Sequence, residues 1–164
     1  MAIEFGLVSF SSSLILFLSA SSPSKTCFTS SAVEVLLPIK LKDVCSDDIV
    51  GLRNKLLLQL GYETMRRRSE ICQFKFEDLQ HFGNHKHALL LRHSKTDHYN
   101  QGKIIPISGE LSELISSWSL AIDQDRGYIL RSFKRNHSTK SSLTPASINH
   151  ILKSLQKQAG LNQI

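Results

Sequence analysis

The segment Tyr62–Ile71, which reads YETMRRRSEI, places three consecutive arginines beside a Ser-Glu pair. It follows an apolar run with helical spacing and precedes a run in which apolar and polar residues alternate. A run of like charges is in most proteins a solvated helix face. The three arginines therefore need support from other segments before a binding or catalytic role follows.

The segment before the arginines is predicted to form a long core helix. Ser46, Asp47 and Asp48 offer an N-cap and acidic residues for the first turn, which favour a helix start. The apolar residues Ile49, Leu52, Leu56 and Leu60 recur every three to four positions, as one face of a helix requires. Leu57 and Leu58 widen this face. This helix of about four turns leads directly into the arginines and would fix their direction.

Three segments after the arginines are predicted to form a small antiparallel sheet. Phe74–Leu79 alternates apolar and polar residues, Ala88–Leu91 is apolar, and Lys103–Ile107 forms the third strand. Pro106 lacks a backbone N–H, which places the third strand at an edge. Ser94–Gly102 is interpreted as the hairpin loop between the last two strands. The predicted fold class is mainly α with a small three-stranded antiparallel sheet.

The rest of the chain is predicted to contain two helices. Ser108 can cap the first of them. An apolar run, Gly127–Leu130, then enters a basic and polar stretch over residues 131–142, which is predicted to be a loop. The last helix has an N-cap, a proline at its first position and a glycine at its end, provided by Thr144, Pro145 and Gly160.

Residues 1–35 differ in composition from a predicted domain over residues 36–164. Leu14–Leu18 is strongly apolar, and serines surround it. A secretory signal, and hence a small exported protein, is one interpretation, although no Lys or Arg precedes Lys25. Leu7–Ala20 is too short and too interrupted by serines to span a bilayer as a helix. A poorly ordered tail, a packed helix and out-of-frame sequence stay open as other interpretations.

Composition indicates the chemical class of the partner and argues against disulfides and metal sites. The chain has 20 Lys and Arg against 14 Asp and Glu, a formal charge of +6, which suits a polyanion such as DNA. The three cysteines have neither metal-binding nor disulfide spacing and are interpreted as reduced thiols of a cytosolic protein. Three histidines crowd one predicted turn without a cysteine or acidic partner, so no metal site is predicted: His81, His85 and His87.

Two segments together resemble one protein family. Tyr62–Ile71 follows the pattern Tyr-x-Thr-(apolar)-x-Arg-x-Ser/Ala-Glu-(apolar), and Ser94–Asp97 reads Ser-Lys-Thr-Asp within the predicted hairpin. These segments resemble the first active-site box and the β-hairpin lysine of the tyrosine recombinases, the phage-integrase and Cre-like family. The order of predicted elements agrees over residues 36–164, so the chain resembles an incomplete catalytic domain of that family.

The resemblance implies site-specific recombination or integration of duplex DNA through a 3′-phosphotyrosyl intermediate, without a cofactor. In such a site Arg67 would stabilise phosphoryl charge, and Lys95 would give a proton to the leaving 5′-oxygen. Glu70 would orient the nearby arginines or neutralise part of their charge. The resemblance also implies double-stranded DNA as the partner, with a homo-oligomer on DNA in the intact family members, and a cytoplasmic, nucleoid-associated location without membrane contact.

The family's His-x-x-Arg box and nucleophilic tyrosine have no match in the 164 residues. Tyr62, Tyr99 and Tyr128 stand at positions that the family does not use for attack. An inactive fragment and a non-catalytic remnant that binds duplex DNA are therefore both expected alternatives. The basic residues predicted to contact DNA are Arg66, Arg68, Arg131, Lys134, Arg135, Lys140, Lys153 and Lys157.

Overall fold

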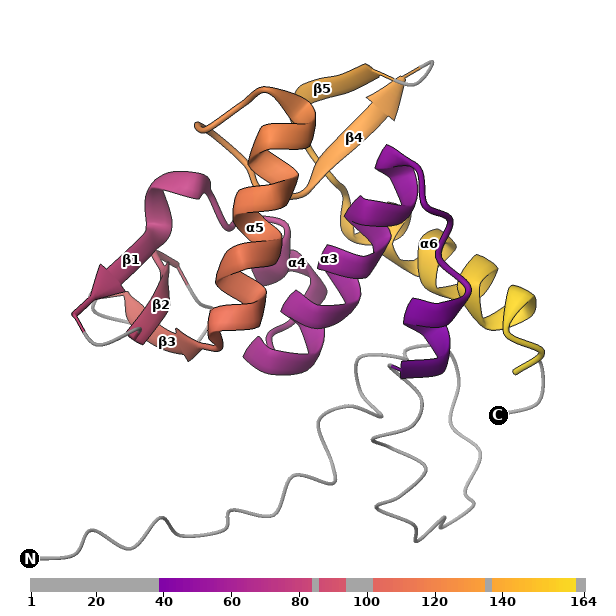
Figure 1. Cartoon of the computed structure of the whole chain (residues 1–164), viewed down its shortest axis with the longest axis horizontal. Coiled ribbons are helices and arrows are strands. Elements are labelled where there is room, and N and C mark those ends of the chain that lie inside the picture. Colours follow the sequence, from indigo (N-terminus) through magenta and orange to yellow (C-terminus); the bar gives the residue numbers. More distant parts are fainter. Residues whose placement is uncertain (1–38, 84–85, 94–101, 135–136, 162–164) are drawn as a thin grey trace, which may run out of the picture.

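The computed structural model describes residues 39–83, 86–93, 102–134 and 137–161. The predicted domain start near residue 36 lies outside these ranges. Residues 39–43 are helical. The elements that follow (Figure 1) are α3 (Ile49–Thr64), α4 (Arg68–Ile71), the 3-10 helix η1 (Phe76–Asp78), β1 (Leu79–Phe82), β2 (Lys86–Leu91), β3 (Lys103–Ile107), α5 (Gly109–Ile122), β4 (Arg131–Lys134), β5 (His137–Ser142) and α6 (Pro145–Gln158).

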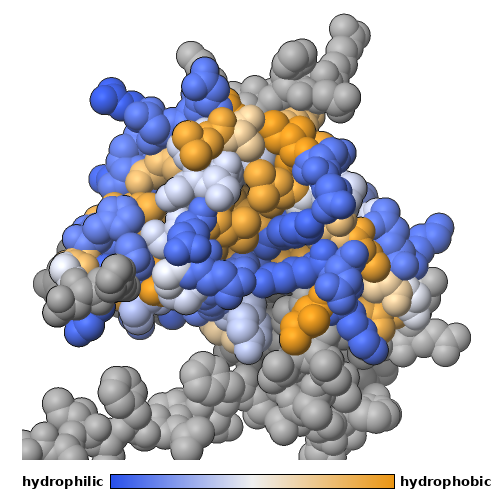
Figure 2. Space-filling model, in the orientation of Figure 1, coloured by the Kyte–Doolittle hydropathy of each residue, from blue (hydrophilic) through white to orange (hydrophobic). Residues whose placement is uncertain are grey.

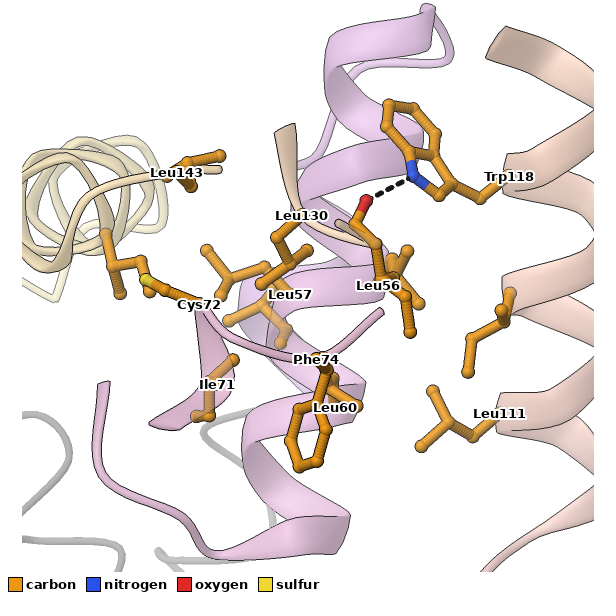
Figure 3. Packing of buried hydrophobic residues seen from close by; sticks show 14 of the residues in the cluster. Leu56, Leu57, Leu60, Ile71, Cys72, Phe74, Leu111, Trp118, Leu130 and Leu143 are labelled. Carbon is orange, nitrogen blue, oxygen red and sulfur yellow. Dashed lines mark hydrogen bonds between the residues drawn. The ribbon is translucent and has the colours of Figure 1, made fainter. Parts of the chain in front are cut away.

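Helix α3 forms the centre of the core, with α5 on one side and α6 on the other (Figure 1). The side chain of Asp48 accepts the backbone N–H of Gly51 at 2.7 Å and caps the first turn, as predicted. Leu56, Leu57 and Leu60 are all fully buried. Figure 3 shows them between α5 and the segment that follows α4. Helix α3, which precedes the arginines, therefore packs both against α5 and against the segment after α4 (Figure 3).

The three-stranded antiparallel sheet has the order β1-β2-β3 and confirms the predicted fold class. Pro106 lies on the edge strand β3, as predicted. The prediction of a strand over Phe74–Leu79 is wrong in part, because the chain forms η1 first and β1 begins at Leu79. The side chain of Asp78 accepts the backbone N–H of Lys75 at 3.0 Å. This local hydrogen bond closes the turn at η1, which the alternation of apolar and polar residues in the sequence did not indicate.

Residues 131–142 are a second correction, because the predicted loop is a hairpin. β4 and β5 pair antiparallel, with an irregular register between Arg131 and Phe133. Most of the residues in these strands are polar, so the sequence lacks the alternation that indicates a half-buried strand. The backbone N–H of Leu143 donates to the carbonyl of Leu130 at 2.9 Å and fixes the base of the hairpin.

The surface is mixed in character. Figure 2 shows apolar residues exposed among polar ones on the face seen in Figure 1. Among the described residues, no helix is long and apolar enough to cross a membrane. The large exposed apolar side chains come from separate elements, and single exposed apolar residues are normal for a protein surface: Ile39, Tyr62, Phe82, Ile104 and Leu120.

Met65, which ends α3, has a left-handed backbone with φ 48°. This conformation costs a residue with a Cβ about 1 kcal/mol. We expect Met65→Gly to raise the free energy of unfolding by up to about 1 kcal/mol, measured by urea denaturation. Asp123 also has a positive φ of 52°, but Asp tolerates this region better, so Asp123→Gly is the matched control and should gain less. A loss of stability in Met65→Gly would contradict the expectation.

Candidate active site

Arg67 stands at the start of α4, where a buried carboxylate holds it. Glu70 accepts the backbone N–H of Arg67 at 3.2 Å and lies 3.4 Å from the Arg67 Nη1 atom. The side chain of Arg67 is 58% exposed, whereas that of Glu70 is 6% exposed. The buried Glu70 therefore orients both the backbone and the side chain of Arg67. Much of the guanidinium surface is left open to solvent.

The neighbouring arginines are placed differently. Arg66 is half-buried, and its Nε atom donates to the carbonyl of Thr64 at 3.0 Å. Arg68 is also half-buried and begins α4. Arg67 is thus the most exposed of the three consecutive arginines. A guanidinium has five N–H donors in a planar fork, so Arg67 can bind two oxygens of one phosphate while it keeps its contact with Glu70.

The residues that follow α4 join the arginine box, Tyr62–Ile71, to the core. Ile71, Cys72 and Phe74 are buried. In Figure 3 the side chain of Phe74 lies beside α3, whereas the sulfur of Cys72 points toward α6. The hydroxyl of Ser142 donates to the carbonyl of Cys72. Ser142 ends β5 shortly before α6. This hydrogen bond therefore connects the segment after the arginine box to the C-terminal part of the described chain. The position of Arg67 is therefore set by the core.

Burial raises the pKa of the Cys72 thiol from 9.0 to about 11. The pKa is higher in the folded than in the unfolded state, so the protonated thiol favours the folded state. This stabilisation is fully present below pH 9 and is lost as the pH rises toward 11. The thiolate is the reactive form. We expect alkylation of Cys72 at pH 9 to be at least about tenfold slower in the folded protein than in urea, measured by peptide mass spectrometry. Equal rates in both states would show that the thiol is not buried.

Two of the crowded histidines form a pair. His81 and His87 lie opposite each other in the β1–β2 ladder, and their Nδ1 atoms are 2.7 Å apart. The hydroxyl of Ser112 lies 3.3 Å from the His87 Nδ1 atom, whereas His85 lies outside the described residues. No group of three or more potential metal ligands occurs in the described part of the chain. Each of these two histidines thus has a hydrogen-bond partner within the protein.

A family model described as "Phage integrase family" matches residues 39–164. The chain belongs to the phage integrase family. The "Integrase/recombinase xerD homolog" of Selenomonas ruminantium is 30% identical over 124 residues, which cover 71% of this chain and 36% of the relative. "Tyrosine recombinase XerA" of Pyrococcus horikoshii is 32% identical over 112 residues, which cover 68% of this chain and 36% of the relative. The chain thus spans about a third of each of these relatives.

Solved recombinase structures share the fold of this integrase-family chain. The post-cleavage complex of the XerH site-specific recombinase with palindromic difH substrate matches with a TM-score of 0.59 at 18% identity. The matched region covers 77% of this chain and 34% of the XerH chain. The structure of the XerA recombinase also has a TM-score of 0.59 at 18% identity, and it covers 85% of this chain and 46% of that chain. At such low identity the likeness shows the fold.

Lys95, the predicted hairpin lysine of this integrase-family chain, lies outside the described residues. The strands on either side of it are described. β2 and β3 are antiparallel neighbours, with Leu91 opposite Lys103. This pairing confirms that Ser94–Gly102 connects two adjacent strands, as the sequence predicted. The proton-donor role of Lys95 stays a prediction.

Arg131 is a correction to the predicted set of DNA-binding residues. It is only 2% exposed, and its guanidinium donates to the carbonyl of Tyr128 at 2.8 Å and to the Gln124 Oε1 atom at 3.2 Å. It also donates to the carbonyl of Arg126. Burial lowers the pKa of Arg131, and the nearby Glu77 opposes this change. The side chain thus stabilises the turn before β4 and is not available to DNA.

The other predicted DNA-binding residues are only partly described. Lys153 and Lys157 are exposed on α6, where they suit a phosphate contact. Arg135 and the side chains of Lys134 and Lys140 lie outside the described part of the structure. Sequence reasoning also missed one contact, between Asp78 and Arg92, whose Oδ1 and Nε atoms are 2.5 Å apart. Its only signal in the sequence is an arginine three residues before Lys95.

Proposed function

We propose that this chain is the first part of the catalytic domain of a tyrosine recombinase that acts on duplex DNA. One observation carries the proposal: Arg67, in the arginine box of a phage-integrase domain, has an exposed side chain oriented by a buried Glu70. An exposed, oriented guanidinium matches what a phosphodiester requires. A homo-oligomer on DNA and a nucleoid-associated location belong to the same proposal.

The proposed reaction is a phosphoryl transfer. A tyrosine hydroxyl attacks the phosphorus of a phosphodiester, the bond to the 5′-oxygen breaks, and a 3′-phosphotyrosyl link forms. Negative charge gathers on the non-bridging oxygens, and Arg67 would donate hydrogen bonds to them. The leaving 5′-oxygen takes up a proton, which Lys95 would supply. Glu70 would act by holding Arg67 in this position.

The attacking tyrosine is not assigned to any residue of this sequence. Tyr62 is 37% exposed, at the end of α3. Tyr128 is half-buried, and the Lys75 Nζ atom stands over its ring at 5.4 Å from the ring centre. Tyr99 lies outside the described residues. The second candidate function is duplex binding without covalent chemistry, which the formal charge of +6 and the exposed Lys153 and Lys157 on α6 support.

The test is a fluorescence anisotropy titration of a labelled duplex of mixed sequence, repeated at several salt concentrations. We expect binding that weakens linearly on a log–log plot as salt rises, because lysine and arginine displace cations from the phosphates. A labelled single strand is the control and should bind less tightly, since few aromatic residues are available to stack on bases. No binding to the duplex at low salt would overturn the proposal.

A denaturing gel of the same mixtures distinguishes the two candidates. A band that contains protein and DNA after denaturation indicates a covalent phosphotyrosyl link and supports the recombinase. Duplex binding without such a band favours binding alone. The gel is most informative with nicked duplexes, because loss of the short cleaved strand prevents the reverse reaction.

A further inference from the structure

His81 and His87 bring two imidazole nitrogens together on the three-stranded sheet. The two residues are direct partners in the antiparallel β1–β2 ladder, and residues directly opposite each other in a ladder project from the same face. Their rings meet edge to face at an interplanar angle of 88°, and their Nδ1 atoms are 2.7 Å apart. The pairing of the two strands therefore fixes the distance between the two nitrogens.

The scaffold behind this pair is rigid on one side and open on the other. β2, which carries His87, is the central strand of the sheet, and Leu89, two residues further along the same face, is fully buried. The hydroxyl of Ser112 on α5 lies 3.3 Å from the His87 Nδ1 atom, and Ser112 is itself buried. His87 is half-buried, whereas His81 is exposed. An ion can thus reach a preorganised pair of nitrogens from solvent.

The chemistry of the pair follows from its protons. A neutral imidazole has one nitrogen with a proton and one with a free lone pair. Since the two Nδ1 atoms face each other at 2.7 Å, one of them donates the proton of a hydrogen bond and the other accepts it. If both protons are on the Nε2 atoms, two lone pairs point into the same space. Imidazole nitrogen is a good ligand for Zn²⁺, Cu²⁺ and Ni²⁺, so a cation can take the place of the shared proton.

The distance between the two nitrogens discriminates among these metals. With metal–nitrogen bonds of about 2.0–2.1 Å, two tetrahedral ligands are about 3.3–3.4 Å apart, whereas two neighbouring ligands at right angles are about 2.8–3.0 Å apart. The 2.7 Å between the His81 and His87 nitrogens is much closer to the second value. Right angles are typical of the tetragonal sites of Cu²⁺ and Ni²⁺. The described residues contain no group of three potential ligands, so water would complete the coordination.

We propose that His81 and His87 form a binding site for one divalent metal ion of tetragonal geometry, Ni²⁺ or Cu²⁺, which both rings coordinate through Nδ1. In a neutral pair, the ring with its proton on Nδ1 changes to the Nε2 tautomer, so binding releases no proton. The ion links β1 to β2 and stabilises the folded state. The site lies on the sheet, outside the arginine box, and the proposal does not depend on the proposed DNA chemistry.

The test is isothermal titration calorimetry of the full chain, without an affinity tag, with Ni²⁺ in a buffer free of chelators. Ni²⁺ is the probe because Cu²⁺ can oxidise cysteine thiols. We expect one saturable site per chain. His81→Gln and His87→Gln should each raise the Kd at least about tenfold, since loss of even an outer partner of a metal ligand costs that much. The double variant should lose little more than either single variant, because one imidazole alone forms no chelate.

His150→Gln is the matched control for these variants. It removes an exposed imidazole from α6 and should keep the native Kd. If His87→Gln unfolds, as shown by thermal melting, the variant at the exposed position, His81→Gln, decides alone. Equal Kd values for the native chain and His81→Gln would overturn the site. Losses that add in the double variant would show that the two rings do not bind one ion together.

Two further measurements test the geometry and the link between the strands. Zn²⁺ prefers tetrahedral ligands and should bind the native chain more weakly than Ni²⁺, whereas tighter binding of Zn²⁺ would contradict the assigned geometry. Because the nitrogen pair exists only when β1 and β2 are paired, Ni²⁺ should raise the melting temperature of the native chain but not that of His81→Gln. An equal rise in both proteins would place the bound ion elsewhere.

Discussion

Arg131→Ala is expected to lower the free energy of unfolding by about 3 kcal/mol and to leave the salt slope of duplex binding unchanged. The native guanidinium donates to the Tyr128 carbonyl, the Arg126 carbonyl and the Gln124 amide. It also lies 5.9 Å from the centre of the Phe76 ring. The variant loses this cation–π contact and leaves carbonyl groups unpaired. Urea denaturation measures the first effect and fluorescence anisotropy the second.

Arg131→Lys is the informative companion variant. It keeps the charge but loses the planar fork that reaches several acceptors at once, so most of the stability loss should persist. If the role were electrostatic attraction to DNA, Arg131→Lys would behave like the native protein. A fall in the salt slope of Arg131→Ala, with unchanged stability, would return this residue to the DNA-binding set.

Trp118→Ala is expected to cost about 3–5 kcal/mol of unfolding free energy, a large part of the roughly 5–15 kcal/mol that stabilises an ordinary domain. The side chain is fully buried on α5, and its indole N–H donates to the carbonyl of Ile129 at 2.7 Å (Figure 3). Its ring centre lies 5.9 Å from that of Phe133. Truncation leaves a cavity and an unpaired carbonyl between α5 and the segment before β4. Urea denaturation followed by circular dichroism measures the loss.

Two further variants divide this loss into its parts. Trp118→Phe keeps most of the apolar volume but removes the hydrogen bond to Ile129, so a loss of about 1–3 kcal/mol is expected. Leu120→Ala, on the same helix, is the surface control because Leu120 is 83% exposed, and it should stay within about 0.5 kcal/mol of the native value. Equal losses in Trp118→Ala and Leu120→Ala would contradict the described packing.

Local signals in the sequence predicted the three long helices α3, α5 and α6 but not the short helix α4. The N-cap residues Asp48, Ser108 and Thr144 each accept a backbone N–H in the first turn of a helix. Gly160 has the predicted left-handed conformation, with φ 70°. These features depend on residues within one turn of each other, so the sequence alone shows them. The sheet order also follows from short connections between neighbouring strands.

The missed features depend on contacts and burial that no periodic pattern in the sequence indicates. Arg131 looks like any basic residue in a polar stretch, and only the fold shows that it is buried. The Ser142 hydroxyl and the Cys72 carbonyl that it contacts are 70 positions apart. By contrast, Arg67 and Glu70 are three positions apart, so the box itself revealed their contact. Periodicity carries no information on contacts between separate elements.

The most direct test of the central claim is the salt dependence of duplex binding by Arg67→Ala, compared with Lys55→Ala. Both variants remove one positive charge, but Lys55 lies on α3 and is paired with Asp47 at 3.1 Å. If Arg67 binds a DNA phosphate, Arg67→Ala should bind more weakly, with a salt slope smaller by about 0.9, while Lys55→Ala keeps the native slope. Equal slopes for the native protein and Arg67→Ala would contradict the proposed function of this site.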